Sequence, residues 1–294
     1  METHTLKSAM IGLSGGVAGG GLNAVGVALG LTSSESIWPV AATCVVLGTL
    51  LHHTKQSLGT MLDNRTHTLR NRVERIGRDI GDIHGLVRLA PYTSALPLPI
   101  GGGWALTGDS AALLAREVLI RAPNTILELG SGVSTLILGQ ILKQRGHGHL
   151  LSIDHDPLWA DKTRANIDYL GLQDFVSVLD APLKTVTLGG QAYNWYDIQE
   201  DRLAALGPID LLLVDGPPQA EHSATQARYP AFPMLRERLS PEALIFVDDA
   251  NRSTESKMVE RWQTEDSGWH AQRFGTVDGV CILTKKNDGL ITAA

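Results

Sequence analysis

The chain has 294 residues and a formal net charge of −6 at pH 7. This length accommodates one large α/β domain with an appendage, and the negative charge argues against nucleic acid as a partner, because it would repel phosphates. With Cys44 and Cys281 as its only cysteines, one chain cannot assemble a disulfide framework or a zinc cluster.

Two uncharged apolar runs lie within residues 1–54. Residues 8–34 carry no charge, and their core, 9–31, is long enough to span a bilayer as a helix. The eight glycines of this run would weaken a helix in water but let two helices approach closely in lipid. A second, shorter run covers 36–54. We therefore predict a transmembrane helical hairpin over residues 1–54.

Basic residues give this hairpin an orientation. Lys7 precedes the first run, the linker between the runs has no basic residue, and Lys55 and several arginines follow the second run. The positive-inside tendency places both ends in the cytoplasm. We therefore predict a location at the cell membrane, with the bilayer as a partner and the remainder of the chain facing the cytoplasm. The alternative is a glycine-rich helical hairpin inside a soluble protein.

Residues 55–90 are predicted to form a linking helix, either amphipathic or coiled-coil. Its apolar residues recur mainly at alternating steps of four and three, which is the seam of a coiled coil. These seam residues are Leu62, Leu69, Val73, Ile76, Ile80, Ile83 and Val87. Glycines at 77, 81 and 85 weaken such a helix. Two interpretations stay open: a homo-oligomer joined through residues 62–87, or a helix that packs on its own domain.

Residues 91–294 alternate short apolar runs with helical patterns, which is typical of a parallel sheet covered by helices on both faces. The candidate strands are 125–129, 149–154, 176–179, 209–215 and 243–247. Two further runs, 269–274 and 280–284, are joined by a short, turn-rich linker, so we expect them to form an antiparallel hairpin. Other doubly wound folds share this spacing.

The first of these strands leads directly into a glycine-containing loop, residues 128–135, which read Glu-Leu-Gly-Ser-Gly-Val-Ser-Thr. Glycines let the backbone pass close to a ligand, and the helix that follows directs free N–H groups at it. Asp154 ends the second strand roughly twenty residues later, where a carboxylate accepts hydrogen bonds from the hydroxyls of a ribose. The pattern predicts a nucleoside-containing ligand.

Two features favour S-adenosylmethionine over a nicotinamide dinucleotide. Thr135 stands where the dinucleotide fingerprint has its third glycine. Glu128 ends the first strand, where its carboxylate would repel a pyrophosphate but would suit the cationic, amino-acid end of S-adenosylmethionine.

Residues 91–286 resemble class I S-adenosylmethionine-dependent methyltransferases, within them a bacterial branch with Glu-Leu-Gly-Ser-Gly-x-Ser-Thr and Asp-Gly-Pro-Pro motifs. Six stretches carry the resemblance in order and spacing: 102–105, 128–135, 152–156, 178–183, 214–218 and 247–252. The resemblance implies an α/β fold, a Rossmann-like seven-stranded sheet with a terminal antiparallel hairpin. In this chain the transmembrane hairpin and the linking helix would precede it.

The resemblance also implies site residues. Those that would bind the cofactor are Glu128, Gly130, Gly132, Ser134, Asp154, His155, Asp180 and Ala181. The first four would flank the methionine moiety, the next two the ribose and adenosine, and the last two the adenine. Asp215 would lie beside the methyl-bearing sulfur. The aromatic run at 193–196 is interpreted as core packing, and Arg228 is weighed as a substrate contact.

Three carboxylates, those of Asp215, Asp248 and Asp249, end neighbouring strands and would suit Mg²⁺ or another divalent cation. Such an ion would orient two substrate oxygens and acidify the hydroxyl to be methylated. Among metal-dependent O-methyltransferases, the macrolide-sugar type, with an aspartate and a later Asp-Asp pair, is the better match. The catechol type has an asparagine where this chain has Ala250. In the metal-free alternative Asp215 or Asp249 acts as general base, or positioning alone suffices.

We therefore predict a membrane-anchored S-adenosylmethionine-dependent methyltransferase. It would methylate an oxygen of a small-molecule, lipid-linked or glycan acceptor. One alternative is a non-catalytic, membrane-tethered scaffold that binds the nucleoside. Another is an NAD-dependent oxidoreductase.

Overall fold

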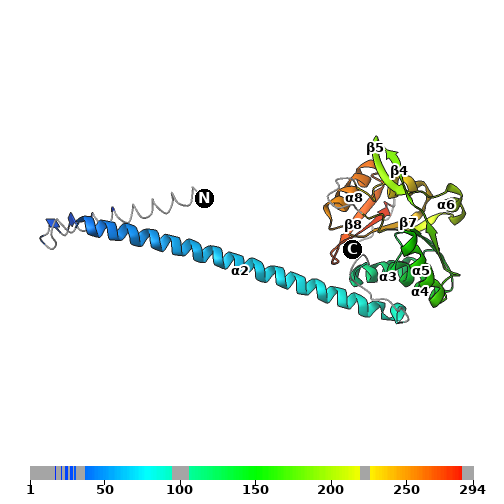
Figure 1. Ribbon diagram of the computed structural model, residues 1–294, viewed down its shortest axis with the longest axis horizontal. Helices are drawn as coiled ribbons and strands as arrows, with labels where there is room; N and C mark the ends of the chain where they lie inside the picture. The colour runs from blue at the N-terminus through cyan, green and yellow to red at the C-terminus, as the bar shows by residue number, and fades with distance from the viewer. Residues whose placement is uncertain are drawn as a thin grey trace. The chain divides into compact units, whose positions relative to one another are not determined.

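The computed structural model describes residues 37–94, 106–218 and 226–286, together with isolated positions between residues 17 and 30 (Figure 1). The chain divides into two compact units, Met1–Ile76 and Gly77–Ala294. A single long helix, α2 (Ile37–Thr93), starts in the first unit and ends in the second.

The first unit is helical at every position from Ile37 to Ile76. Threonines along this stretch do not interrupt the helix, because their hydroxyls donate to carbonyls three or four residues back, as Thr54 does to Leu50. Large apolar side chains are exposed along it: Val46, Leu47, Leu50, Leu51, Leu58, Met61, Leu62, Leu69, Val73 and Ile76.

The predicted transmembrane hairpin requires a correction. Among the residues that the structure describes, no helix combines the length and the apolar character needed to cross a membrane. Residues 37–54 of the second run form the start of α2, but His52, His53 and Lys55 follow Leu51. The apolar stretch is therefore shorter than the about 20 residues that a bilayer core needs. The predicted location at the cell membrane, facing the cytoplasm, is corrected on this ground. Most of the first run, 9–31, lies outside the described residues.

The last turns of α2 belong to the second unit and pack against the rest of it through a face with glycines. A Cβ on Gly85 would lie 2.2 Å from the carbonyl oxygen of Gly108, so the two backbones touch. Asp82 accepts a hydrogen bond from the Gly108 amide, and Leu89 is buried. The predicted seam residues of this stretch stay exposed: Ile80, Ile83 and Val87. The helix therefore contacts its own domain with one face and leaves the seam uncovered.

A seven-stranded sheet forms the centre of the second unit, in the order β3-β2-β1-β6-β7-β9-β8. Five strands are parallel: β1 (Thr125–Leu129), β2 (His149–Asp154), β3 (Val176–Asp180), β6 (Ile209–Val214) and β7 (Leu239–Val247). β8 (Trp269–Phe274) and β9 (Val280–Lys285) form an antiparallel hairpin that pairs with β7. The predicted sheet and its terminal hairpin are confirmed.

Alternate residues of the central strands enter two different cores. Ile126 and Leu150 pack with the helices α3 (Gly108–Arg121), α4 (Val133–Arg145) and α5 (Pro157–Leu170). Leu127 and Ile153 point to the opposite core, which includes α6 (Glu200–Leu206), α7 (Ala231–Leu235) and α8 (Ser253–Glu265). A short 3₁₀ helix, η2 (Arg236–Arg238), follows α7. Strands buried on both faces explain the continuous apolar runs in the sequence.

A second, two-stranded sheet lies outside the main one. It consists of β4 (Leu183–Leu188) and β5 (Gln191–Tyr196), which pair antiparallel between β3 and α6 in the chain (Figure 1). This hairpin was not predicted from the sequence. Its inner side chains, Tyr193, Trp195 and Tyr196, are buried in the same core as α7 and α8.

Candidate functional site

The carboxyl ends of the parallel strands place four acidic residues along one edge of the sheet. Glu128 lies on β1, Asp154 ends β2, Asp180 ends β3 and Asp215 follows β6. Asp154 and Asp180 are direct partners in the parallel register. Ligands of open α/β sheets bind outside this edge, so the acidic row marks the candidate site.

Glu128 is fully buried beneath the glycine loop. Its two carboxylate oxygens accept hydrogen bonds from the hydroxyls of Ser134 and Thr135, each over 2.5 Å. Thr135 in turn accepts a bond of 2.9 Å from the Gly132 amide, which ties the loop to this carboxylate. Burial raises the pKa of Glu128 to about 7, although the hydroxyl donors oppose the shift. The carboxylate is therefore poised to change its charge near neutral pH.

The loop that joins β1 to α4 leaves open space at one position. Gly130 has a φ of +100°, a conformation that favours glycine, and a Cβ there would lie 3.5 Å from the backbone of Asp215. At Gly132, in contrast, an added Cβ would meet no atom within 4 Å. The backbone at Gly132 is therefore accessible to a ligand at the start of α4, where helix N–H groups are available.

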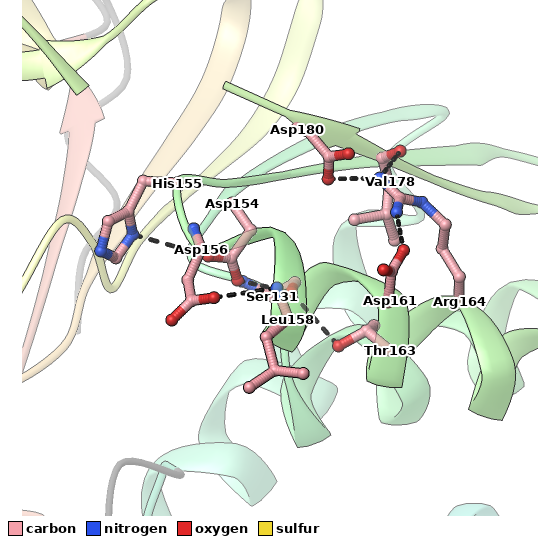
Figure 2. Close-up of polar contacts among 10 residues, drawn as sticks. All are labelled: Ser131, Asp154, His155, Asp156, Leu158, Asp161, Thr163, Arg164, Val178 and Asp180. Atoms are coloured by element: carbon pink, nitrogen blue, oxygen red, sulfur yellow. Dashed lines mark hydrogen bonds and ion pairs between the residues drawn. The ribbon is translucent and has the colours of Figure 1, made fainter. Parts of the chain in front are cut away.

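Asp154 is held by the loop that it faces (Figure 2). Its Oδ2 accepts bonds from the amide and the hydroxyl of Ser131, over 2.9 and 2.6 Å. Its Oδ1 accepts the amide of Asp156 over 3.0 Å and lies 3.5 Å from Nδ1 of His155. The Ser131 hydroxyl also lies 3.2 Å from that of Thr163 on α5. These contacts fix β1, β2 and α5 around one buried carboxylate.

The end of β3 is more open. Asp180 forms an ion pair with Arg164 of α5, and Arg164 also contacts Asp161 over 2.6 Å (Figure 2). The Asp180 side chain is half exposed. Ala181 is buried, and its amide donates to the carbonyl of Asp154 over 2.7 Å. Of these two predicted adenine contacts, the side chain of Asp180 is the one that solvent reaches.

A second acidic group gathers at the ends of β6 and β7. Ligand oxygens of Asp215, Asp248 and Asp249 all lie within 4.8 Å of one another. Arg228 lies among them: its Nη2 is 3.0 Å from Oδ2 of Asp249 and 3.3 Å from Oδ1 of Asp215. Arg252 holds the other oxygen of Asp249 over 2.8 Å. The three predicted carboxylates are thus close together, and those of Asp215 and Asp249 are paired with arginines.

Burial and repulsion between the carboxylates raise the pKa values of Asp215 and Asp248. Burial raises the pKa of Asp215 well above its usual range, and the guanidinium of Arg228 opposes the shift. Burial raises the pKa of Asp248 to about 7, with the Asp249 carboxylate adding to the effect. Oδ1 of Asp248 is buried and has no hydrogen-bond partner among the described residues.

Tyr196, the last residue of β5, reaches the same place from the outer hairpin. A Cβ on Gly216 would lie 2.3 Å from its hydroxyl oxygen, so the hydroxyl contacts the turn after Asp215. That hydroxyl is buried and, within the part of the chain that the structure describes, has no hydrogen-bond partner. Its ring meets that of His155 edge to face at 6.4 Å. Burial and the neighbouring carboxylates raise the pKa of Tyr196.

Comparisons with known proteins bear on this domain. Solved structures with similar folds include an SAH-bound methyltransferase of Podospora anserina, PaMTH1, at 15% identity, covering 69% of this chain and 88% of that chain with a TM-score of 0.48. The O-methyltransferase TomG of Streptomyces achromogenes is 17% identical over 69% and 90% of the two chains, with a TM-score of 0.46. An O-methyltransferase of Bacillus cereus is 19% identical over 69% and 91%, with a TM-score of 0.47. A search of curated proteins found no match.

Residues 127–250 match the model of a family described as methyltransferase domain. This stretch of the chain is therefore similar to methyltransferase domains. The matched residues run from β1 to just past β7 and include every acidic residue described above. The seven-stranded sheet of the second unit, with its terminal antiparallel hairpin, is the sheet that the sequence resemblance implies.

The sequence did not predict the positions of two side chains at this edge of the sheet, those of Tyr196 and Arg228. Tyr196 belongs to the aromatic run that was interpreted as core packing, and three of its four residues do pack in the core. The signal that could have found it is the Gly189-Gly190 pair, where both residues have positive φ, as a tight hairpin turn requires. Arg228 was weighed as a substrate contact, but its side chain is only 4% exposed.

One predicted stretch cannot be placed. Residues 95–105, which contain the whole of the first matching stretch, 102–105, lie outside the described residues, as do residues 219–225 after the turn at Gly216. The other five stretches, from residue 128 to residue 252, lie on or directly after β1, β2, β3, β6 and β7.

Proposed function

We propose that the methyltransferase domain binds S-adenosylmethionine above the carboxyl ends of β1 and β2 and transfers its methyl group to an oxygen of a small acceptor. The observation that carries this proposal is the open backbone at Gly132 between two buried carboxylates, Glu128 and Asp154. A ligand that fits there needs a cationic group on one side and hydroxyl donors on the other. S-adenosylmethionine carries both.

Glu128 argues for this cofactor over a nicotinamide dinucleotide. A pyrophosphate at the start of α4 would lie next to a buried carboxylate, with no cation on the described part of β1 or the loop to offset it. An ammonium group would instead stabilise the ionised form of Glu128. Asp154 would receive the ribose hydroxyls, and Asp180 would lie near the adenine, in keeping with its exposed side chain.

When bound, S-adenosylmethionine supplies an electrophilic methyl group on a positively charged sulfur. The protein's task is to hold an acceptor oxygen in line with that group and to receive its proton. Asp215 suits the second task, because its backbone lies against Gly130 and its side chain is 16% exposed. Its raised pKa makes it a stronger base than an ordinary aspartate.

Asp249 suits a supporting role. Its side chain is 8% exposed, and both of its oxygens are engaged by arginines, Arg228 on one and Arg252 on the other. It therefore orients Arg228, which in turn contacts Asp215. Tyr196 completes the site, since its hydroxyl faces the turn at Gly216 and would meet a ligand placed between that turn and the glycine loop.

These contacts bear on whether the three carboxylates of the predicted metal site are available as ligands. A divalent ion requires carboxylate oxygens that point to one place and are available as ligands. Of the three carboxylates, Asp249 has both oxygens paired and Asp215 has one paired with Arg228. With the guanidinium of Arg228 in place, these three carboxylates do not suit a divalent ion as ligands.

The test is calorimetric titration of the full chain with S-adenosylmethionine, with Asp154→Asn compared to Asp161→Asn. Asp161 is a matched control, since it is an exposed aspartate of α5 that contacts only Arg164 among the described residues. Loss of a charged acceptor weakens such bonds by about 1.5–3 kcal/mol, roughly 10- to 100-fold in Kd. We expect that loss in Asp154→Asn and wild-type affinity in Asp161→Asn. Binding of NAD in place of S-adenosylmethionine, or equal effects of both variants, would overturn the proposal.

A further inference from the structure

The acidic group at the ends of β6 and β7 contains its own cation. Arg228 is buried, and its Nη2 bridges Asp249 at 3.0 Å and Asp215 at 3.3 Å. Its Nη1 donates to the carbonyl of Asp248 over 3.3 Å, so a single guanidinium contacts all three aspartates. A buried guanidinium is tolerated only where such partners surround it.

The chain also adopts an unfavourable backbone conformation to build this arrangement. Asp249 has a φ of +61°, in the left-handed region that few residues other than glycine adopt. This conformation places its carboxylate between Arg228 and Arg252, over 3.0 and 2.8 Å. Backbone strain of this kind persists where the surrounding structure requires it, commonly at functional sites.

We propose that Arg228 takes the place of a divalent cation, so that methyl transfer by this domain is independent of metal. Its guanidinium orients Asp215 toward the acceptor and neutralises Asp249. Arg228 is in this account a positioning residue, because it acts through the aspartates. The inference rests on the proposed function for its catalytic meaning, but cation binding is measured without S-adenosylmethionine.

The unpaired carboxylate oxygen of Asp248 leads to a consequence of this proposal that can be measured. Oδ1 of Asp248 is buried with no partner among the described residues, and it would be a ligand for a metal if the neighbouring positive charge were removed. In the wild type that charge repels a second cation. Replacement of Arg228 by an uncharged side chain of similar length leaves three carboxylates facing one space. Such a variant gains the metal site that the wild type lacks.

The experiment is calorimetric titration of the full chain with Mn²⁺ after EDTA treatment and desalting, for the wild type and Arg228→Met. Arg228→Lys is the matched control that keeps the charge, and Arg228→Met with Asp248→Asn removes the orphan ligand. We expect Arg228→Met to bind Mn²⁺ at least tenfold more tightly than the wild type and the other two variants. Wild-type binding as tight as that of Arg228→Met would overturn the inference.

A second measurement applies if Arg228→Met does not fold. The melting temperature of the wild type is compared in EDTA and in Mn²⁺, alongside Asp248→Asn. Because a ligand that binds the folded state raises its melting temperature, we expect no change for the wild type. A rise in the wild type that Asp248→Asn abolishes would contradict the inference. Failure to bind S-adenosylmethionine would affect neither result, so the two proposals fail separately.

Discussion

The amide and the hydroxyl of Ser131 both donate to the same carboxylate oxygen of Asp154, over 2.9 and 2.6 Å. These two hydrogen bonds join the loop after β1 to the end of β2 (Figure 2). It sets the carboxylate in a fixed orientation, with Oδ1 held by the amide of Asp156. The protein's own hydrogen bonds therefore fix the carboxylate of Asp154, the residue proposed to receive the ribose.

Ser131→Ala removes one of these two bonds. We expect the free energy of unfolding to fall by about 0.5–1.5 kcal/mol, the usual net value of one hydrogen bond, and the Kd for S-adenosylmethionine to rise by about three- to tenfold. Urea unfolding and calorimetric titration measure the two effects. Ser256→Ala, at an exposed hydroxyl on α8, is the control. Full affinity in Ser131→Ala would mean that the loop does not orient Asp154 for binding.

Gly132→Ala separates folding from ligand binding. A Cβ at this position meets nothing within 4 Å, and φ is 173°, an extended conformation that alanine adopts. Stability should therefore change by less than about 0.5 kcal/mol. The methyl group would enter the space assigned to the ligand, so affinity for S-adenosylmethionine should fall at least tenfold. Gly275→Ala is the matched control, since it also meets open space but lies in the β8–β9 hairpin. Equal affinities in the two variants would contradict the assignment.

The raised pKa of Glu128 predicts a pH dependence of stability. Its folded-state pKa, about 7, lies above the ordinary value of 4.5, so the folded state holds the proton more tightly than the unfolded state. The stabilising contribution is fully present below pH 4.5 and is lost as the pH rises through about 7. Glu128→Gln keeps a neutral group at all pH values. It should exceed the wild type in stability at pH 8 by up to about 3 kcal/mol, and match it at pH 4. Parallel urea curves for both proteins across this range would count against the assignment.

Tyr196→Phe distinguishes a ligand contact from a packing role. The hydroxyl is buried without a partner among the described residues, so its removal should leave stability unchanged or raise it by about 1 kcal/mol. If the hydroxyl contacts the cofactor or acceptor, binding or turnover should fall about tenfold. Calorimetry and thermal unfolding measure both. Phe232→Leu, in the core next to Trp262, is a packing control that should lower stability and spare affinity. Unchanged affinity together with unchanged turnover in Tyr196→Phe would restrict this residue to packing.

The exposed seam of α2 keeps the prediction of a homo-oligomer open to test. Leu69 and Ile76 are 61% and 57% exposed, and isolated helices with such a stripe gain stability by pairing with a second copy. Leu69→Glu with Ile76→Glu should shift the molar mass measured by light scattering to that of a monomer. Ile120→Glu, at a 70% exposed isoleucine on α3, should not. A wild type that is already monomeric at micromolar concentration contradicts the prediction.

The sheet could be predicted from the sequence because its strands are buried on both faces and therefore read as unbroken apolar runs. The β4–β5 hairpin was not predicted because its strands are partly exposed and include polar residues, such as Lys184 and Asn194, so they lack a continuous apolar run. The membrane prediction failed at His52 and His53, which end the second apolar run early. A long apolar stretch on a helix has more than one explanation, and length decides between them.

Some residues of the candidate site could likewise be predicted from the sequence, and others could not. Glu128, Asp154 and Asp215 could be assigned to one edge because each ends a parallel strand. The position of Arg228 could not be predicted, because it depends on contacts with Asp215 and Asp249, which come from other parts of the chain. The left-handed conformation of Asp249 is equally invisible in the sequence, since aspartate adopts it only in a particular setting.

The central claim is that S-adenosylmethionine binds over the glycine loop between Glu128 and Asp154. The most direct measurement is a crystal structure of the full chain grown with S-adenosylhomocysteine. The account predicts density for the ligand with its ribose at Asp154, its amino-acid end over Gly132 and its sulfur next to Asp215. Density at another place on the domain, or a loop that stays empty at saturating ligand, would contradict it.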